Sequence, residues 1–196
     1  VRRGLDGLDV VLMVSAAESE KRLDERRAFV DAAAEAGVRH LVDISFFGAS
    51  PASTFLLARD HDATEQHIER SGMTWTHLRD NLYADFMPLL ADADGVIRGP
   101  ARAGRVTFSL TGPEAITLSE AAVTMSRVLG RDYSFRDETL DEAYASRSGH
   151  GAPSWQVDAW VSTYTAIASG ELSALSDDVH QLTGREPRSL ADLLAR

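Results

Sequence analysis

Cysteine is absent from the 196 residues, and lysine is almost absent, since Lys21 is the only one among 20 Lys and Arg residues. Without cysteine the chain has no disulfide, no thiolate metal ligand and no cysteine nucleophile. It has no apolar run near the ~20 residues of a membrane span, and no stretch of signal-peptide type precedes residue 10. The net charge of -10 disfavours nucleic acid, which prefers basic surfaces. We expect a cytoplasmic protein that binds neither nucleic acid nor membrane.

Strand and helix signals alternate through the first half of the chain. The apolar run Val10–Val14 is typical of a parallel strand that is covered on both faces. Strands that alternate with helices across short loops predict a parallel sheet with helices on its faces. The predicted elements are a strand at 10–14, a helix at 20–37, a strand at 38–45, a helix at 54–71, a strand at 73–81 and a short helix at 83–92.

Helical spacing also predicts which residues of the two long helices face the sheet. For the first helix these are Leu23, Val30 and Ala34, and for the second Leu57, His61, Thr64 and Ile68.

The second half of the chain is predicted to be mostly helical. Capping boxes, in which a threonine and a glutamate lie three residues apart, begin helices at Thr117 and Thr139. A strand is predicted at 105–112 and a short edge strand at 133–138. Further helices are predicted at 153–170, after Ser176 and at the end of the chain.

Several segments, taken together and in order, resemble one family. They are "VSAAESEKR", "AAAEAGVRHLVDIS", "HDATE", "SGMTWTHLRDNLYADF", "GVIRGPA", "LTGPEAITLSEA" and "LTGREPRSLADLL". The chain resembles the NmrA-like branch of the atypical short-chain dehydrogenases/reductases, and within it the bacterial NADPH-dependent quinone oxidoreductases. The resemblance implies a Rossmann-like, doubly wound parallel sheet with a small, mostly helical C-terminal lobe. It implies NADP(H) as the cofactor, with NAD(H) as the alternative.

Members of this family begin with a strand, a G-x-x-G-x-x-G loop, a helix and two more strands before the equivalent of Val10. The chain lacks that portion, so we expect a parent protein that carries the loop upstream. A second gap is expected at 101–103. The resemblance therefore implies a partial NAD(P)-binding core at 1–110 and a substrate lobe at 111–196, within one compact domain.

The family register also assigns a role to His61. No tyrosine of this chain has a lysine four residues later, so the usual Tyr-x-x-x-Lys pair is missing. Extended members of the superfamily carry the pattern Y-x-x-x-K-x-x-x-E on the corresponding helix. At its Tyr, Lys and Glu positions this chain has Leu57, His61 and Glu65. The resemblance thus places His61 where lysine holds the nicotinamide ribose, and leucine where the proton donor would stand. A quinone, which takes its protons from water, tolerates that loss better than a ketone.

Two other interpretations of His61 remain open. It can be a packed helix histidine, or it can ligate a metal together with Glu65. Because no third ligand is evident, we expect no metal site.

Small and aromatic residues follow the first two predicted strands, at the edge where open α/β sheets bind ligands. Ser15, Ala16 and Ala17 would let a cofactor approach the backbone, or would only cap the next helix. Ser45 is expected near the nicotinamide. Phe46 and Phe47 would flank the ring or fill the loop.

Asn81 and Tyr83 follow the third predicted strand. Asn81 is a candidate to bind the nicotinamide amide or a substrate carbonyl, and Tyr83 to stack on a flat acceptor. The alternatives are a turn asparagine and a core tyrosine. For Arg79 we expect a structural ion pair.

The sequence therefore predicts an NAD(P)H-dependent oxidoreductase that passes hydride to a quinone-like electrophile, as a monomer or homodimer. His61, Tyr83 and Asn81 are the candidate catalytic residues. The alternative is a non-enzymatic NmrA-like redox sensor that binds the dinucleotide.

Overall fold

The structure is a computed structural model that describes residues 4–15, 18–99 and 112–195. The chain divides into two compact units, Val1–Asp80 and Asn81–Arg196. The division expected at 110/111 falls within residues that the structure does not describe, and it stays a prediction.

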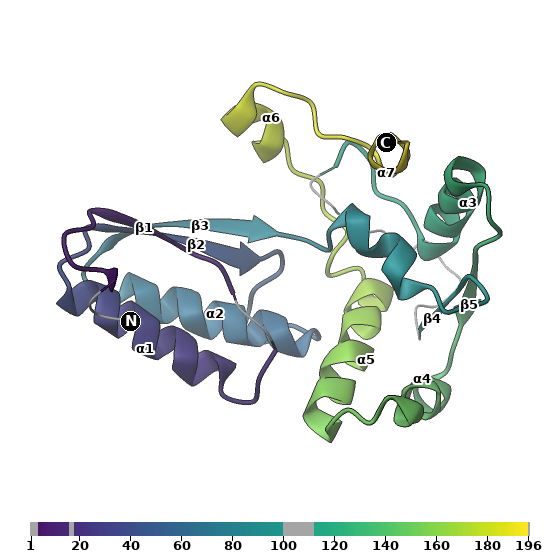
Figure 1. Ribbon diagram of the computed structural model, residues 1–196, viewed down its shortest axis with the longest axis horizontal. Coiled ribbons are helices and arrows are strands. Elements are labelled where there is room, and N and C mark those ends of the chain that lie inside the picture. Colours follow the sequence, from purple (N-terminus) through teal and green to yellow (C-terminus); the bar gives the residue numbers. More distant parts are fainter. Residues whose placement is uncertain (1–3, 16–17, 100–111, 196) are drawn as a thin grey trace. The chain divides into compact units, whose positions relative to one another are not determined.

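The first unit is a three-stranded parallel sheet with two helices on one of its faces (Figure 1). Its strand order is β1-β2-β3, as the alternating sequence pattern predicts. β1 and β2 are each followed by a connection and a helix that returns along the sheet, which is the arrangement of βαβ units. The elements are β1 (Val10–Met13), α1 (Arg22–Glu35), β2 (His40–Phe46), α2 (Leu56–Glu69) and β3 (Thr74–Asp80).

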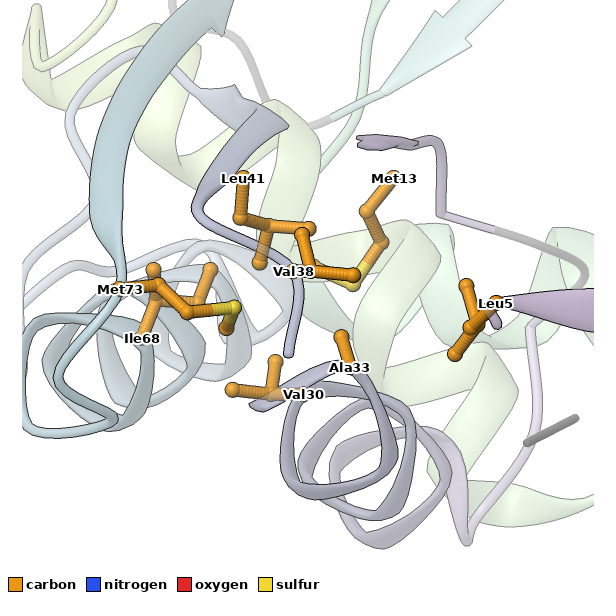
Figure 2. Packing of buried hydrophobic residues seen from close by; sticks show 8 residues of the cluster. All are labelled: Leu5, Met13, Val30, Ala33, Val38, Leu41, Ile68 and Met73. Carbon is orange, nitrogen blue, oxygen red and sulfur yellow. The ribbon is translucent and has the colours of Figure 1, made fainter. Parts of the chain in front are cut away.

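The core of this unit lies between the sheet and the two helices. Figure 2 shows Met13 and Leu41 of the sheet on one side and Val30 and Ala33 of α1 on the other. All four side chains are buried. The full cluster comprises Leu5, Met13, Val30, Ala33, Val38, Leu41, Ile68 and Met73.

The predicted inner face of α1 is partly wrong. Val30 is buried as expected and Ala34, partly buried, packs against the core. The other buried positions are Arg22, Arg26 and Ala33, whereas Leu23 is only partly buried. The prediction assumed that only apolar residues of this helix face the sheet, whereas two arginines on successive turns also face inward.

The inner face of α2 agrees better with its prediction. His61, Thr64 and Ile68 are buried as expected, whereas Ala58 is buried in place of Leu57.

The expectation that β1 is covered on both faces is wrong. Val10, Leu12 and Val14 are 60%, 58% and 62% exposed, whereas Met13, which points to the helices, is 6% exposed. Neighbouring strand residues point to opposite faces, and α1 and α2 cover only one of them.

In its described residues the second unit is mostly helical and contains a small parallel pair of strands. Both predicted capping boxes are present, at Thr117 with Glu120 and at Thr139 with Glu142. The expected edge strand is present as β5, whereas nearly all of the strand expected at 105–112 lies outside the described residues. The elements are η2 (Ala84–Leu90), β4 (Val96–Gly99), α3 (Leu118–Leu129), β5 (Ser134–Asp137), α4 (Leu140–Arg147), η3 (Ser148–His150), α5 (Ser154–Ser169), α6 (Asp178–Thr183) and α7 (Leu190–Leu194).

Across the described residues, every helix is too short or too polar to cross a lipid bilayer.

Candidate functional site

One buried arginine joins two of the predicted site residues. Arg26 of α1 donates from Nη2 to the hydroxyl of Ser15, which follows β1, and the same Nη2 lies 3.2 Å from Nε2 of His61 on α2. Its Nη1 lies 3.5 Å from the hydroxyl of Thr64, one helical turn beyond His61. Arg26 and His61 are each 7% exposed. Arg26 therefore joins Ser15 and His61 near the carboxyl end of β1.

This contact determines which nitrogen of His61 carries the proton. A guanidinium has only donors, so Nε2 of His61 must accept from Arg26 and the hydrogen must reside on Nδ1. Nδ1 is buried and has no hydrogen-bond partner. The ring is also neutral, because burial, then the charge of Arg26 and then that of Arg22, lower the pKa of His61 to about 2. His61 is thus a neutral donor whose N–H has no acceptor.

A cavity adjoins Arg26. It has a volume of about 280 Å³ and includes a second buried arginine, Arg22, whose Nε is buried without a hydrogen-bond acceptor. The nearest carboxylate is Asp60, with Oδ2 3.8 Å from that Nε. The lining residues are Leu12, Met13, Val14, Ser15, Arg22, Glu25, Arg26 and Phe29.

Ser45 belongs to a separate hydrogen-bonded group under β2 and β3. Its hydroxyl, fully buried, donates to Oε1 of Glu65 at 2.5 Å. Arg79 donates to the same carboxylate from Nε at 2.9 Å and from Nη2 at 2.5 Å. Burial by itself would raise the pKa of Glu65, but the hydrogen bonds from Arg79 and Ser45 outweigh it and lower that pKa. The structural ion pair predicted for Arg79 is confirmed.

The sequence left open a metal ion bound by His61 together with Glu65. In the structure the two side chains have different partners, because Arg79 and Ser45 bind Glu65 whereas Arg26 contacts His61. In the part of the chain that the structure describes, the histidine and acidic residues form no cluster able to hold a metal ion.

The aromatic residues at the end of β2 differ in their surroundings. Phe46 is 8% exposed, and its ring packs against Phe55 and, with centroids 6.0 Å apart, against His61. Phe47 is partly exposed, and its amide donates to the carbonyl of Asp80. Ala16 and Ala17 lie outside the described residues.

Asn81 and Tyr83 belong to the second unit. Asn81 is 5% exposed, and its side chain accepts from the amide of Leu82 at 2.8 Å and lies 3.4 Å from the carbonyl of Leu172. Tyr83 is 50% exposed and makes an edge-to-face contact with Phe86. The alternative of a core tyrosine is wrong, because Tyr83 is half exposed.

Sequence reasoning missed Arg22 and Arg26. Their i, i+4 spacing on a helix was the available signal, but arginines at that spacing usually form an exposed face. Only the packing of α1 against the sheet shows that they point inward.

Comparison with known proteins agrees with the Rossmann-like arrangement. A family model described as NAD(P)H-binding matches residues 1–87. The chain is 30% identical to the (4-alkanoyl-5-oxo-2,5-dihydrofuran-3-yl)methyl phosphate reductase of Streptomyces griseus. The aligned region covers 97% of this chain and 76% of that reductase. An NmrA-like family domain-containing oxidoreductase of Aspergillus flavus is 25% identical, covering 95% and 72%.

A solved structure shows the same fold. The NADPH-dependent quinone oxidoreductase of Escherichia coli, complexed with NADPH, superimposes with a TM-score of 0.87 at 22% identity, over 99% of this chain and 78% of that one. Fold and family model together define an NAD(P)H-binding reductase of Rossmann type. Within that class the chain belongs to the NmrA-like branch of the atypical short-chain dehydrogenases/reductases, and it is an NAD(P)H-dependent oxidoreductase. The resemblance seen in the sequence is confirmed.

Proposed function

We propose that the protein transfers hydride from NAD(P)H to a flat, quinone-like acceptor. The observation that carries the proposal is the buried Nδ1–H of His61, which has no acceptor within the described residues. A buried donor without a partner costs free energy, so a ligand that supplies an acceptor there is favoured. The quinone acceptor of the Escherichia coli relative supports the choice of substrate class.

The residues of the first unit fit the cofactor. His61 donates from Nδ1 to a ribose hydroxyl, and Arg26 holds the ring in the tautomer that can do so. The Ser15 hydroxyl, itself held by Arg26, is the second polar group offered to the cofactor, and Phe46 and Phe47 offer apolar contacts. Ser45 orients Glu65 and contributes to the fold of this edge. When bound, NAD(P)H supplies the hydride.

Proton supply distinguishes a quinone from a carbonyl substrate. At neutral pH His61 has no proton to give, because its pKa is about 2 and its Nδ1–H belongs to the neutral ring. Leu57 stands at the register position of the usual acid and has no acidic proton. The reduced quinone therefore takes its protons from water, whereas the alkoxide from a ketone would need a positioned acid.

The acceptor surface of the second unit is the pair Tyr83 and Phe86. Each residue is 50% exposed, and their rings lie 5.7 Å apart, edge to face. Two exposed aromatic rings offer a flat acceptor both stacking and edge contacts.

Replacing His61 tests the cofactor role. One neutral hydrogen bond contributes about 0.5–1.5 kcal/mol, so His61→Ala in the full-length protein should weaken NADPH binding about two- to tenfold. His67→Ala is the matched control, because His67 lies on the same helix and pairs with Asp31 on the surface.

Calorimetric titration with NADPH measures both variants, and NADPH oxidation with a panel of quinones tests the acceptor. Unchanged affinity together with a marked drop in melting temperature would show that His61 only packs. Tight NADPH binding without oxidation by any quinone would contradict the acceptor class.

A further inference from the structure

Two buried arginines line the same cavity of the first unit. Arg22 and Arg26 lie on successive turns of α1 and are 8% and 7% exposed. The cavity also includes Met13 and Ser15 from the carboxyl end of β1. Arginine is almost never this deeply buried without a partner for its charge and donors.

The hydrogen bonds of the two arginines are unequal. Arg26 reaches Ser15, His61 and Thr64. Arg22 makes no comparable contact within the described residues, since its Nε has no acceptor. Its distance of 3.8 Å to Asp60 exceeds the range of a hydrogen bond.

The charges around the cavity also leave room for an anion. Burial lowers the pKa of Arg26 to about 10, and the charge of Arg22 is the next cause. After burial, the charges of Arg26 and Arg22 are the causes that lower the pKa of His61. Asp60, 3.8 Å from Arg22, together with Glu18 for Arg22 and Asp43 for Arg26, offsets part of the positive charge, and Glu25 lines the cavity but is exposed.

We propose that this cavity binds a tetrahedral oxyanion of the phosphate class, held by Arg22 and supported by Arg26. A guanidinium presents donors in a planar fork that matches two oxygens of one phosphate. The volume of about 280 Å³ far exceeds the ~30 Å³ share of one water molecule, so a phosphate group fits. The site rests on the proposed function and deepens it, because its physiological source is either a phosphate of the dinucleotide or a phosphate on the substrate.

Inorganic phosphate is the probe for the full-length protein at constant ionic strength. NMR signals of the arginine Nε–H groups report binding directly, and the signal lost in Arg22→Met identifies Arg22. We expect the Arg22 signal to shift on titration. We also expect Arg22→Met to weaken phosphate binding about ten- to a hundredfold, as for a charge-assisted hydrogen bond. Arg27→Gln, on the same helix but outside the cavity, should leave the affinity unchanged.

The wild-type titration keeps the test decisive if Arg22→Met fails to fold. Arg22→Lys, which retains the charge but loses the fork, then serves as the second variant and should bind phosphate more weakly. An Arg22 signal that stays in place at saturating phosphate concentrations, or equal losses in the Arg22 and Arg27 variants, would overturn the proposal.

Addition of NADPH separates the two sources of the anion. If phosphate no longer shifts the Arg22 signal in the presence of saturating NADPH, the dinucleotide supplies the anion. If phosphate still binds, a phosphorylated substrate supplies it. Both results support the site, and neither depends on turnover, so a failure of the quinone assay leaves this test intact.

Discussion

Replacing Arg79 with methionine should destabilise the protein by an amount that grows with pH. Glu65 is 4% exposed and receives two hydrogen bonds from Arg79 and one from Ser45. In Arg79→Met the carboxylate stays buried but loses its cation. A buried group that loses its partner costs about 1–3 kcal/mol, and more when the group is charged. Because the Arg79 side chain is 46% exposed, water screens the pair, and we expect about 1–2 kcal/mol at pH 7.

The direction of the pH dependence follows from the pKa of Glu65. In the wild type this pKa lies below its ordinary value of 4.5, so the carboxylate stabilises the fold above pH 4.5 and the gain is lost as the pH falls. In Arg79→Met burial should raise the pKa above 4.5, so this variant loses stability as the pH rises through it. Both effects make the difference between the two proteins largest at neutral pH, and the difference shrinks as the pH falls through 4.5 and below.

Thermal unfolding followed by circular dichroism measures this difference. At ~2–4 °C per kcal/mol for a chain of this size, the variant should melt about 2–8 °C lower at pH 7. Glu65→Gln/Arg79→Met removes the charge as well and should show a smaller, nearly pH-independent loss. The reasoning is refuted if Arg79→Met lowers the melting temperature equally at pH 7 and pH 4.5.

Three further variants or titrations test other parts of the structure. Tyr83→Phe should change the acceptor KM more than kcat, and a loss of kcat beyond about a hundredfold would instead identify Tyr83 as a proton donor. The imidazole signals of His61, assigned with His61→Ala, should stay those of the neutral Nδ1–H tautomer from pH 5 to 8, because the pKa is about 2; a titration in that range would contradict the contact with Arg26. Gly99→Ala should cost about 1–3 kcal/mol in chemical unfolding, because its Cβ would collide with the ring of Tyr164, whereas Gly149→Ala meets no atom; equal effects would count against the packing of β4 on α5.

Local signals in the sequence predicted most of the described helices and strands. The capping boxes at Thr117 and Thr139 form as expected, because such a box satisfies orphan amides within one helical turn and needs no tertiary contact. The order of three strands and two helices followed from alternating periodicity and from the preference of βαβ units for one arrangement.

The candidate site was only partly predictable. The prediction that His61 lies on the inner face of its helix is confirmed by its burial, and Arg26 connects it with Ser15. The family register could not show that the proton of His61 resides on Nδ1, because that depends on Arg26, which lies 35 residues earlier in the chain.

By itself, the sequence therefore determined the family, through the order of its segments. It also determined the alternation of elements and the helix ends, which depend on neighbouring residues. Only the tertiary structure decided that Arg22 and Arg26 point inward and that Glu65 is held by Arg79 and Ser45. A buried charge is stable only when distant residues supply its partners, so the identity of those partners depends on the fold and not on any local pattern.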